Sequence, residues 1–275
     1  MTLIDIFQLV YVIPSYICYT IFTIQLGYRL IRKEETFSNP FYILIFYKGV
    51  TDITLQTTTF LSIKITIFSY FHDFFQTNSY LCSVFYLFST FCYSITFQIM
   101  LIMSLNRFIA VGKPILYKKI FKNYLVYTYI FITLVIGGLI GVISSTFDCT
   151  YVYSSMLERF YISYTTNSII PFVLAYTFGL YIPLITVSFI FNIIAIKRLK
   201  VRNVISSVGS SADMRLFIYT LFSFVVAIIF LSVYILRVVS IFTGDKLYDI
   251  IGTTSLPFII DIETFGSFYF SLFTK

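Results

Sequence analysis

Charged side chains are scarce in this chain of 275 residues, at 11% of the sequence against roughly 25% in a typical soluble domain. Hydrophobic residues make up 59%. A water-soluble fold of this length has too little interior to bury that much apolar surface. The composition therefore excludes an ordinary soluble domain and predicts a membrane protein whose main solvent is lipid.

Histidine and cysteine are also rare, with one histidine and four cysteines. The sequence contains no Ser-His-Asp set, no glycine-rich phosphate loop and no group of ligands with the spacing of a metal site. Nothing therefore supports an enzyme, and we expect neither a cofactor nor a metal. The net charge of +7 does not point to nucleic acid as a partner, because the cations gather in one set of loops.

Long stretches without charge predict the helices, since about 20 residues of α-helix cross a hydrocarbon core of roughly 30 Å. Five stretches are free of charge, and two more are interrupted, one by Lys48 and Asp52 and the other by Asp261 and Glu263. We therefore expect an all-α bundle of seven transmembrane helices forming a single domain, with six as the alternative if the last segment does not span. The expected spans are residues 6–28, 41–63, 80–106, 123–147, 168–196, 216–241 and 250–273.

Lysine and arginine are strongly biased toward one set of the loops between these spans. Fourteen lie after the first, third, fifth and seventh helices, and only Lys64, Arg159 and Lys246 lie in the other set. Cations in short loops favour the cytoplasmic side of a membrane. The bias predicts a multi-pass protein with its N-terminus outside and its C-terminus inside.

The stretch MSLNRFIAVGKPILYKKIF (103–121) opens a run of cations after 33 residues without any charge. The cations are Arg107, Lys113, Lys118, Lys119 and Lys122. They mark the cytoplasmic exit of the third helix and suit anionic lipid head groups. Arg107 either extends to those head groups or has a specific partner, and the sequence leaves both open.

Two of the cysteines lie where a disulfide persists. Cys82 precedes Arg107 by 25 residues, which is about 38 Å of helix and a full crossing of the membrane. Cys149 lies in the second outer loop, on the same oxidising side, whereas the other two cysteines fall inside helices. We expect a Cys82–Cys149 bridge, with two free thiols as the alternative.

An outer cysteine followed 25 residues later by an arginine with a polar residue before it resembles the third helix of rhodopsin-like G-protein-coupled receptors. The text LIMSLNRFIAVGKPILYKKIF is most similar to nematode serpentine chemoreceptors of the gamma-type superfamily, particularly its class V branch, in which asparagine precedes the arginine. The segments NPFYILIFYKGVTD (39–52) and DIETFGSFYFSLF (261–273) are similar to the second and seventh helices of that family. The last segment departs from rhodopsin-like receptors because it lacks Asn-Pro-x-x-Tyr.

This resemblance implies a chemosensory receptor of the plasma membrane that binds a small external ligand and signals through a heterotrimeric G protein. It implies that Arg107, oriented by Asn106, meets the C-terminal segment of a Gα subunit. The contact that holds Arg107 in the inactive state is expected to be weak, because the neutral side chain of Asn106 cannot form an ion pair with it. The cations expected to join this coupling surface are Lys118, Lys119, Lys197 and Arg198.

Charged residues inside the spans are costly in lipid and indicate either pairing or function. Lys48 and Asp52 are four residues apart, which predicts an ion pair within the helix, and the alternative places Asp52 in the core. Asp261 and Glu263 lie about 200° apart around a helix, so we expect that they do not both face the core. Asp52 and Asp261 form the candidate polar core. The same charges support an alternative function, a small-solute transporter or an ion channel with a polar path.

Gly137 and Gly141 form a Gly-x-x-x-Gly motif in the fourth span. Small residues at this spacing let two helices approach closely. We expect packing against a neighbour within the bundle, and the alternative is an oligomer formed through this face.

Overall fold

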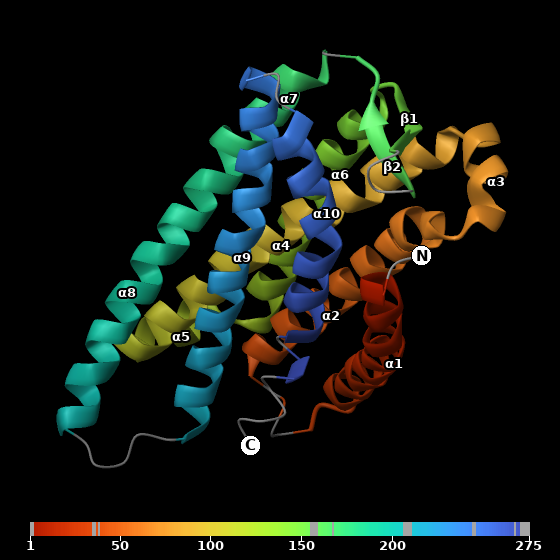
Figure 1. The fold of residues 1–275 in the computed structure, drawn as a ribbon. Coiled ribbons are helices and arrows are strands. Elements are labelled where there is room, and N and C mark those ends of the chain that lie inside the picture. Colours follow the sequence, from red (N-terminus) through yellow and green to blue (C-terminus); the bar gives the residue numbers. More distant parts are fainter. Residues whose placement is uncertain are drawn as a thin grey trace.

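The computed structural model describes residues 3–34, 37, 39–154, 159–166, 168–205, 211–243, 246–266 and 268–269, and most of them are helical (Figure 1). The long helices are α1 (Leu3–Ile31), α2 (Pro40–Thr59), α4 (Tyr80–Gly112), α6 (Asn123–Ser145), α8 (Ile182–Ile205), α9 (Ser211–Thr243) and α10 (Lys246–Asp261). The short ones are α3 (His72–Thr77), α5 (Pro114–Ile120) and α7 (Ile169–Tyr176). The expectation of a mostly helical protein is confirmed.

Five helical segments are long and apolar enough to cross a bilayer. They are Ile6–Ile31, Tyr80–Gly112, Asn123–Ser145, Ile169–Arg198 and Thr220–Ser240. Within the described residues α2 and α10 do not reach this standard, since both carry charged residues and α10 has only 16 residues. Seven spans and their orientation stay a prediction, and residues 267 and 270–273 of the last expected span lie outside the described residues.

α4 is the central helix of the bundle and contacts α2, α5, α6, α8 and α9 (Figure 1). It starts at the residue expected from the sequence and runs six residues past the expected end, to Gly112. It stops there because Lys113 precedes a proline, which disfavours the α conformation, and Lys113 has φ −147° and ψ 72°. α5 begins directly at Pro114.

The glycine motif of α6 packs against the backbone of α4. A Cβ atom on Gly141 would lie 2.6 Å from the carbonyl oxygen of Leu87, and one on Gly137 would lie 3.1 Å from that of Phe91. Both distances are too short for a relaxed contact. The interpretation of the motif as packing within the bundle is therefore confirmed.

Gly141→Ala is expected to destabilise the protein by about 1–3 kcal/mol, because its new methyl group would be forced against the α4 backbone. Gly138→Ala is the matched control, since a Cβ there meets nothing within 4 Å and alanine favours helix. Thermal unfolding of the two purified variants in detergent measures the difference. Equal melting temperatures would show that α6 and α4 do not approach as described.

One π-helical turn lies between two helices, and two others follow the ends of helices. η2 (Phe60–Lys64) extends α2, η5 (Thr177–Tyr181) joins α7 to α8, and η6 (Ile262–Gly266) continues α10. η5 has a local cause, because Pro183 has no N–H to donate to the carbonyl group of Gly179 four residues earlier. Such turns are frequent near functional sites.

A hairpin that the sequence did not predict caps one end of the bundle. Strands β1 (Cys149–Ser154) and β2 (Arg159–Tyr164) are antiparallel, with Cys149 opposite Tyr164, and lie beside α3 (Figure 1). The ring of Tyr164 stacks on that of Tyr86 in α4, with centroids 3.9 Å apart. We call this the hairpin end of the bundle, and the opposite end, where α4 meets α5, the arginine end.

Candidate functional site

Arg107 lies in the last two turns of α4 and is buried, with 4% of its surface exposed. Its guanidinium carbon is 3.7 Å from the centroid of the Phe41 ring, a close cation–π contact. Phe41 is fixed at the start of α2, where its N–H donates to the Asn39 side chain over 2.9 Å. The alternative in which Arg107 extends to the lipid head groups is therefore wrong for this conformation.

α8 meets α4 at the same end through a second arginine. The guanidinium carbon of Arg198 lies 4.9 Å from the centroid of the Phe108 ring. The end of the Arg198 side chain lies directly against Gly112, and a Cβ atom at that position would require the guanidinium group to shift. One turn deeper, Asn192 of α8 donates to the Ser104 hydroxyl over 3.1 Å.

The other predicted coupling residues divide between buried and exposed positions. Asn106 is fully buried, and neither polar atom of its side chain has a hydrogen-bond partner among the described residues. Lys118 and Lys119 are exposed in the last turn of α5, and Lys197 is exposed on α8. The arginine end thus presents exposed ammonium groups around the buried guanidinium group of Arg107 and the half-buried one of Arg198, which suits an acidic or carboxylate-bearing partner.

A buried cluster of charges lies deeper in the bundle. The Lys48 ammonium is 2.7 Å from Asp52 Oδ2 and 2.7 Å from Glu263 Oε1. Tyr19 of α1 donates to the same Asp52 oxygen over 2.9 Å. Both interpretations of Lys48 and Asp52 hold, because the ion pair within α2 forms and Asp52 also faces the core.

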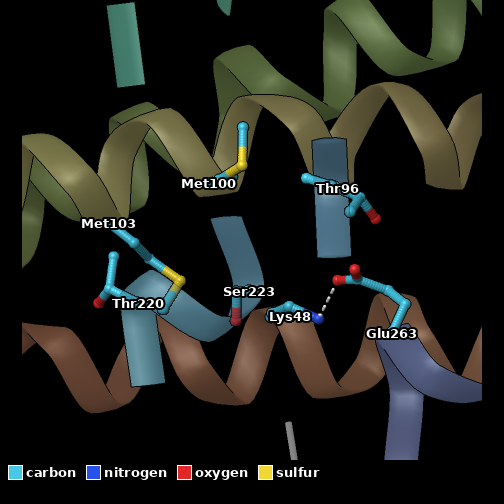
Figure 2. Close-up of a pocket in the computed structure, with 8 residues that line it drawn as sticks. Lys48, Thr96, Met100, Met103, Thr220, Ser223 and Glu263 are labelled. Carbon is cyan, nitrogen blue, oxygen red and sulfur yellow. Dashed lines mark ion pairs between the residues drawn. The ribbon is translucent and has the colours of Figure 1, made fainter. Parts of the chain in front are cut away.

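Figure 2 shows a small cavity beside this cluster, with Glu263 and Thr96 on one side and Met103 on the other. Its volume is about 10 Å³, close to what one water molecule requires. Glu263 Oε2 and the Thr96 hydroxyl are buried without a hydrogen-bond partner among the described residues. The cavity therefore suits one water molecule held between polar groups and is far too small for a solute.

Asp261 forms a separate cluster. Its Oδ1 accepts hydrogen bonds from Gln56 and Lys64, each at 2.7 Å. Its Oδ2 accepts from Gln8 at 2.6 Å and from Tyr11 at 2.8 Å. The expected polar core of Asp52 and Asp261 is thus divided between two clusters, each with its own lysine.

Two expectations about these charges are wrong. Asp261 and Glu263 are both buried, because their helix is enclosed by α1 and α2 on one side and by α9 on another, and only Ile262 between them is exposed. Lys64, which the sequence placed in an outer loop, is buried at the end of η2 and paired with Asp261. Its charge therefore does not count as a loop cation.

Sequence reasoning missed several members of these clusters, namely Gln8, Tyr11, Tyr19, Phe41, Gln56 and Lys64. One signal was available, since Lys48, Asp52 and Gln56 follow each other at intervals of four and lie on one face of a helix. No comparable pattern identifies Gln8 or Tyr11, whose partner is more than 240 residues away.

Cys82 and Cys149 meet at the hairpin end. Both are free thiols in this structure, and Cys149 packs against the hydrophobic cluster that contains the buried Cys82. Hydrogen bonds from Cys82 and Ser83 lower the pKa of the Cys149 thiol, which favours the thiolate that attacks in disulfide formation. The disulfide itself stays a prediction.

Cys82→Ser and Cys149→Ser are each expected to lower the level of the protein at the cell surface, since a bridge across a loop of this length stabilises by roughly 4 kcal/mol. The double variant is expected to be no worse than either single variant, because one bond is lost in all three. Cys18→Ser, in an exposed position on α1, is the matched control. Additive losses in the double variant would mean that the two thiols do not pair.

A comparison with family models matches residues 5–273 to the model described as Srg family chemoreceptor. No curated protein matches the chain.

Proposed function

Because the chain belongs to the Srg family of chemoreceptors, we propose that it is a seven-helix receptor of the plasma membrane that binds a small external chemical and activates a heterotrimeric G protein. The family makes it a membrane-embedded, multi-pass chemoreceptor. Seven spans, the G protein and the plasma membrane are parts of the proposal. The narrower likeness to the class V branch of the gamma-type superfamily stays a prediction.

The orientation in this proposal places the hairpin end outside and the arginine end inside. The distribution of loop cations supports it, and removing Lys64 from the outer set strengthens the bias. The free thiols of Cys82 and Cys149 would then lie on the oxidising side, where a bridge between them persists.

The buried Arg107 at the arginine end is the observation that carries the coupling proposal. A guanidinium group held over Phe41 at a helix end, beside exposed lysines, suits recognition of a carboxylate. In the proposed active state α9 moves outward and Arg107 becomes available to the C-terminal carboxylate or acidic residues of a Gα subunit. Lys118, Lys119 and Lys197 would guide that partner by charge.

The alternative of a transporter or channel is less well supported by the same geometry. Lys48, Asp52 and Glu263 pair with one another, and the cavity that Lys48 and Glu263 line among the described residues holds about one water molecule. A path for a solute would need these charges to face continuous water.

The receptor proposal is tested in cells that express the chain with a set of Gα subunits. A panel of small odorants is applied, and calcium and cAMP are recorded. At least one odorant is expected to give a saturable response that requires a particular Gα subunit. A current or solute uptake that persists without any Gα subunit would favour the transporter or channel instead.

A further inference from the structure

We propose that the donor groups around Asp261 are a carboxylate-binding site, and that the ligand of this receptor is a small organic acid that competes with Asp261 for them. The inference rests on the proposed receptor function and names the chemical class of its ligand. Without ligand, the Asp261 carboxylate would then occupy this site and stabilise the inactive conformation.

The first support is the number of donors that converge on one carboxylate. Asp261 receives four, two on each oxygen, at distances of 2.6–2.8 Å. An ionised carboxylate offers about four lone-pair sites, so its capacity is fully used. This is the arrangement expected of a site made for a carboxylate. Asp52 in the neighbouring cluster has one oxygen, Oδ1, without a partner among the described residues.

The second support is the origin of the groups. All four donors come from the first two long helices. Gln8 and Tyr11 lie on α1, Gln56 lies on α2, and Lys64 lies on η2, which extends α2. Only the acceptor comes from α10. The donor set therefore persists if α10 withdraws. It includes the buried ammonium of Lys64, which requires an anion in place of Asp261. A neutral ligand would leave that charge unpaired.

Two further polar groups on the same face of α2 are unused. Gln56 Oε1 and the Thr59 hydroxyl are buried and have no hydrogen-bond partner among the described residues. They lie three residues apart and so share a helix face. Buried polar groups normally have partners, and these two would bind a hydroxyl group carried by the acid.

The site is close to an end of the bundle. Gln8 lies five residues after Leu3, which is about 8 Å along α1. Tyr11 is only partly buried. In the proposed orientation this end of α1 faces outside, so an external acid approaches beneath the first turns of α1. Displacement of Asp261 by that acid frees α10 and η6 from α1 and α2.

The test removes the internal carboxylate and supplies a free one. Purified Asp261→Ala protein is titrated with formate and acetate, and with formamide and acetamide as neutral controls. The acids are expected to raise the melting temperature saturably, by about 3 °C for a chain of this size, and the amides are not. Asp52→Ala is the matched control, a buried aspartate that also pairs with a lysine, and it is expected to respond much less. Lys64→Met added to Asp261→Ala is expected to abolish the effect.

The same variant is measured in cells in case it resists purification. Formate in the growth medium is expected to raise the surface level of Asp261→Ala, and formamide is not. No effect of the acids in either measurement, or an equal effect in Asp52→Ala, overturns the site. These measurements need no G protein, so a failure of signalling would count only against the proposed function.

The odorant panel tests the chemical class of the ligand separately from the binding site. Organic acids are expected to activate the wild-type receptor, and their methyl esters are not. Activation by the esters alone would overturn the acidic ligand while supporting the receptor function.

Discussion

Arg107→Ala is expected to reduce ligand-driven signalling, normalised to the receptor at the cell surface, by at least tenfold. Truncating a buried charged contact in an interface costs about 2–5 kcal/mol, and about 1.4 kcal/mol is already a factor of ten. The structure places Arg107 over Phe41 with only 4% of its surface exposed, so in the proposed mechanism it leaves a specific resting contact to meet the Gα subunit. A second-messenger assay combined with surface labelling measures the ratio.

Two variants separate coupling from packing. Arg107→Lys keeps the charge and loses the planar guanidinium group, so it is expected to retain part of the signal. Phe41→Leu keeps Arg107 and removes the ring beneath it, so it is expected to raise ligand-free signalling, because a cation–π contact of about 0.5–2 kcal/mol no longer holds the resting position. Full signalling by Arg107→Ala at a normal surface level would contradict the assigned role.

Lys48→Met is expected to destabilise the folded protein by about 3–5 kcal/mol, the range found when one partner of a buried ion pair is removed. The carboxylates of Asp52 and Glu263 would then lie close together without the ammonium group that is now 2.7 Å from each of them. Thermal unfolding of the purified variant in detergent measures the loss, and ligand-free signalling is expected to change with it because α2 and η6 separate.

The control for this variant removes the whole charge cluster. Lys48→Met combined with Asp52→Asn and Glu263→Gln leaves no unpaired charge, and neutral replacement of a buried cluster is often tolerated. The triple variant is therefore expected to be more stable than Lys48→Met alone. A triple variant that is equally or less stable would show that the single substitution acts through lost volume and not through charge.

The starts of α4 and α6 could be predicted, because each lies at or near the beginning of a long stretch without charge. α4 begins at Tyr80 as expected, and its extra six residues end where Lys113 precedes Pro114. α6 begins at Asn123, directly after the last lysine of its loop. The hairpin of β1 and β2 could not be predicted, because its stability depends on contacts such as the Tyr86–Tyr164 stack and not on its own sequence.

The candidate sites were predictable only where their members are close in sequence. Lys48 and Asp52 are four apart and were identified as a pair. The division of the polar core into two clusters was not predictable, because Glu263 joins one and Asp261 the other through partners on α1 and α2. The angular argument about Asp261 and Glu263 failed because it assumed a helix with one buried face, whereas this helix has neighbours on several sides.

The distance in sequence between the paired charges has a consequence for how the chain is made. Lys64 is 197 residues from its partner Asp261. At about 5–20 residues per second a ribosome needs roughly 10–40 s to reach that partner. During this time η2 carries the cation of Lys64 without its partner, at a cost of about 2.5–3.5 kcal/mol in the membrane, whereas Lys48 already has Asp52 in its own helix. We therefore expect the η2 end of the second helix to reach its buried position only after the last helix is made, so that a defect in the last helix would also displace the end of the second one.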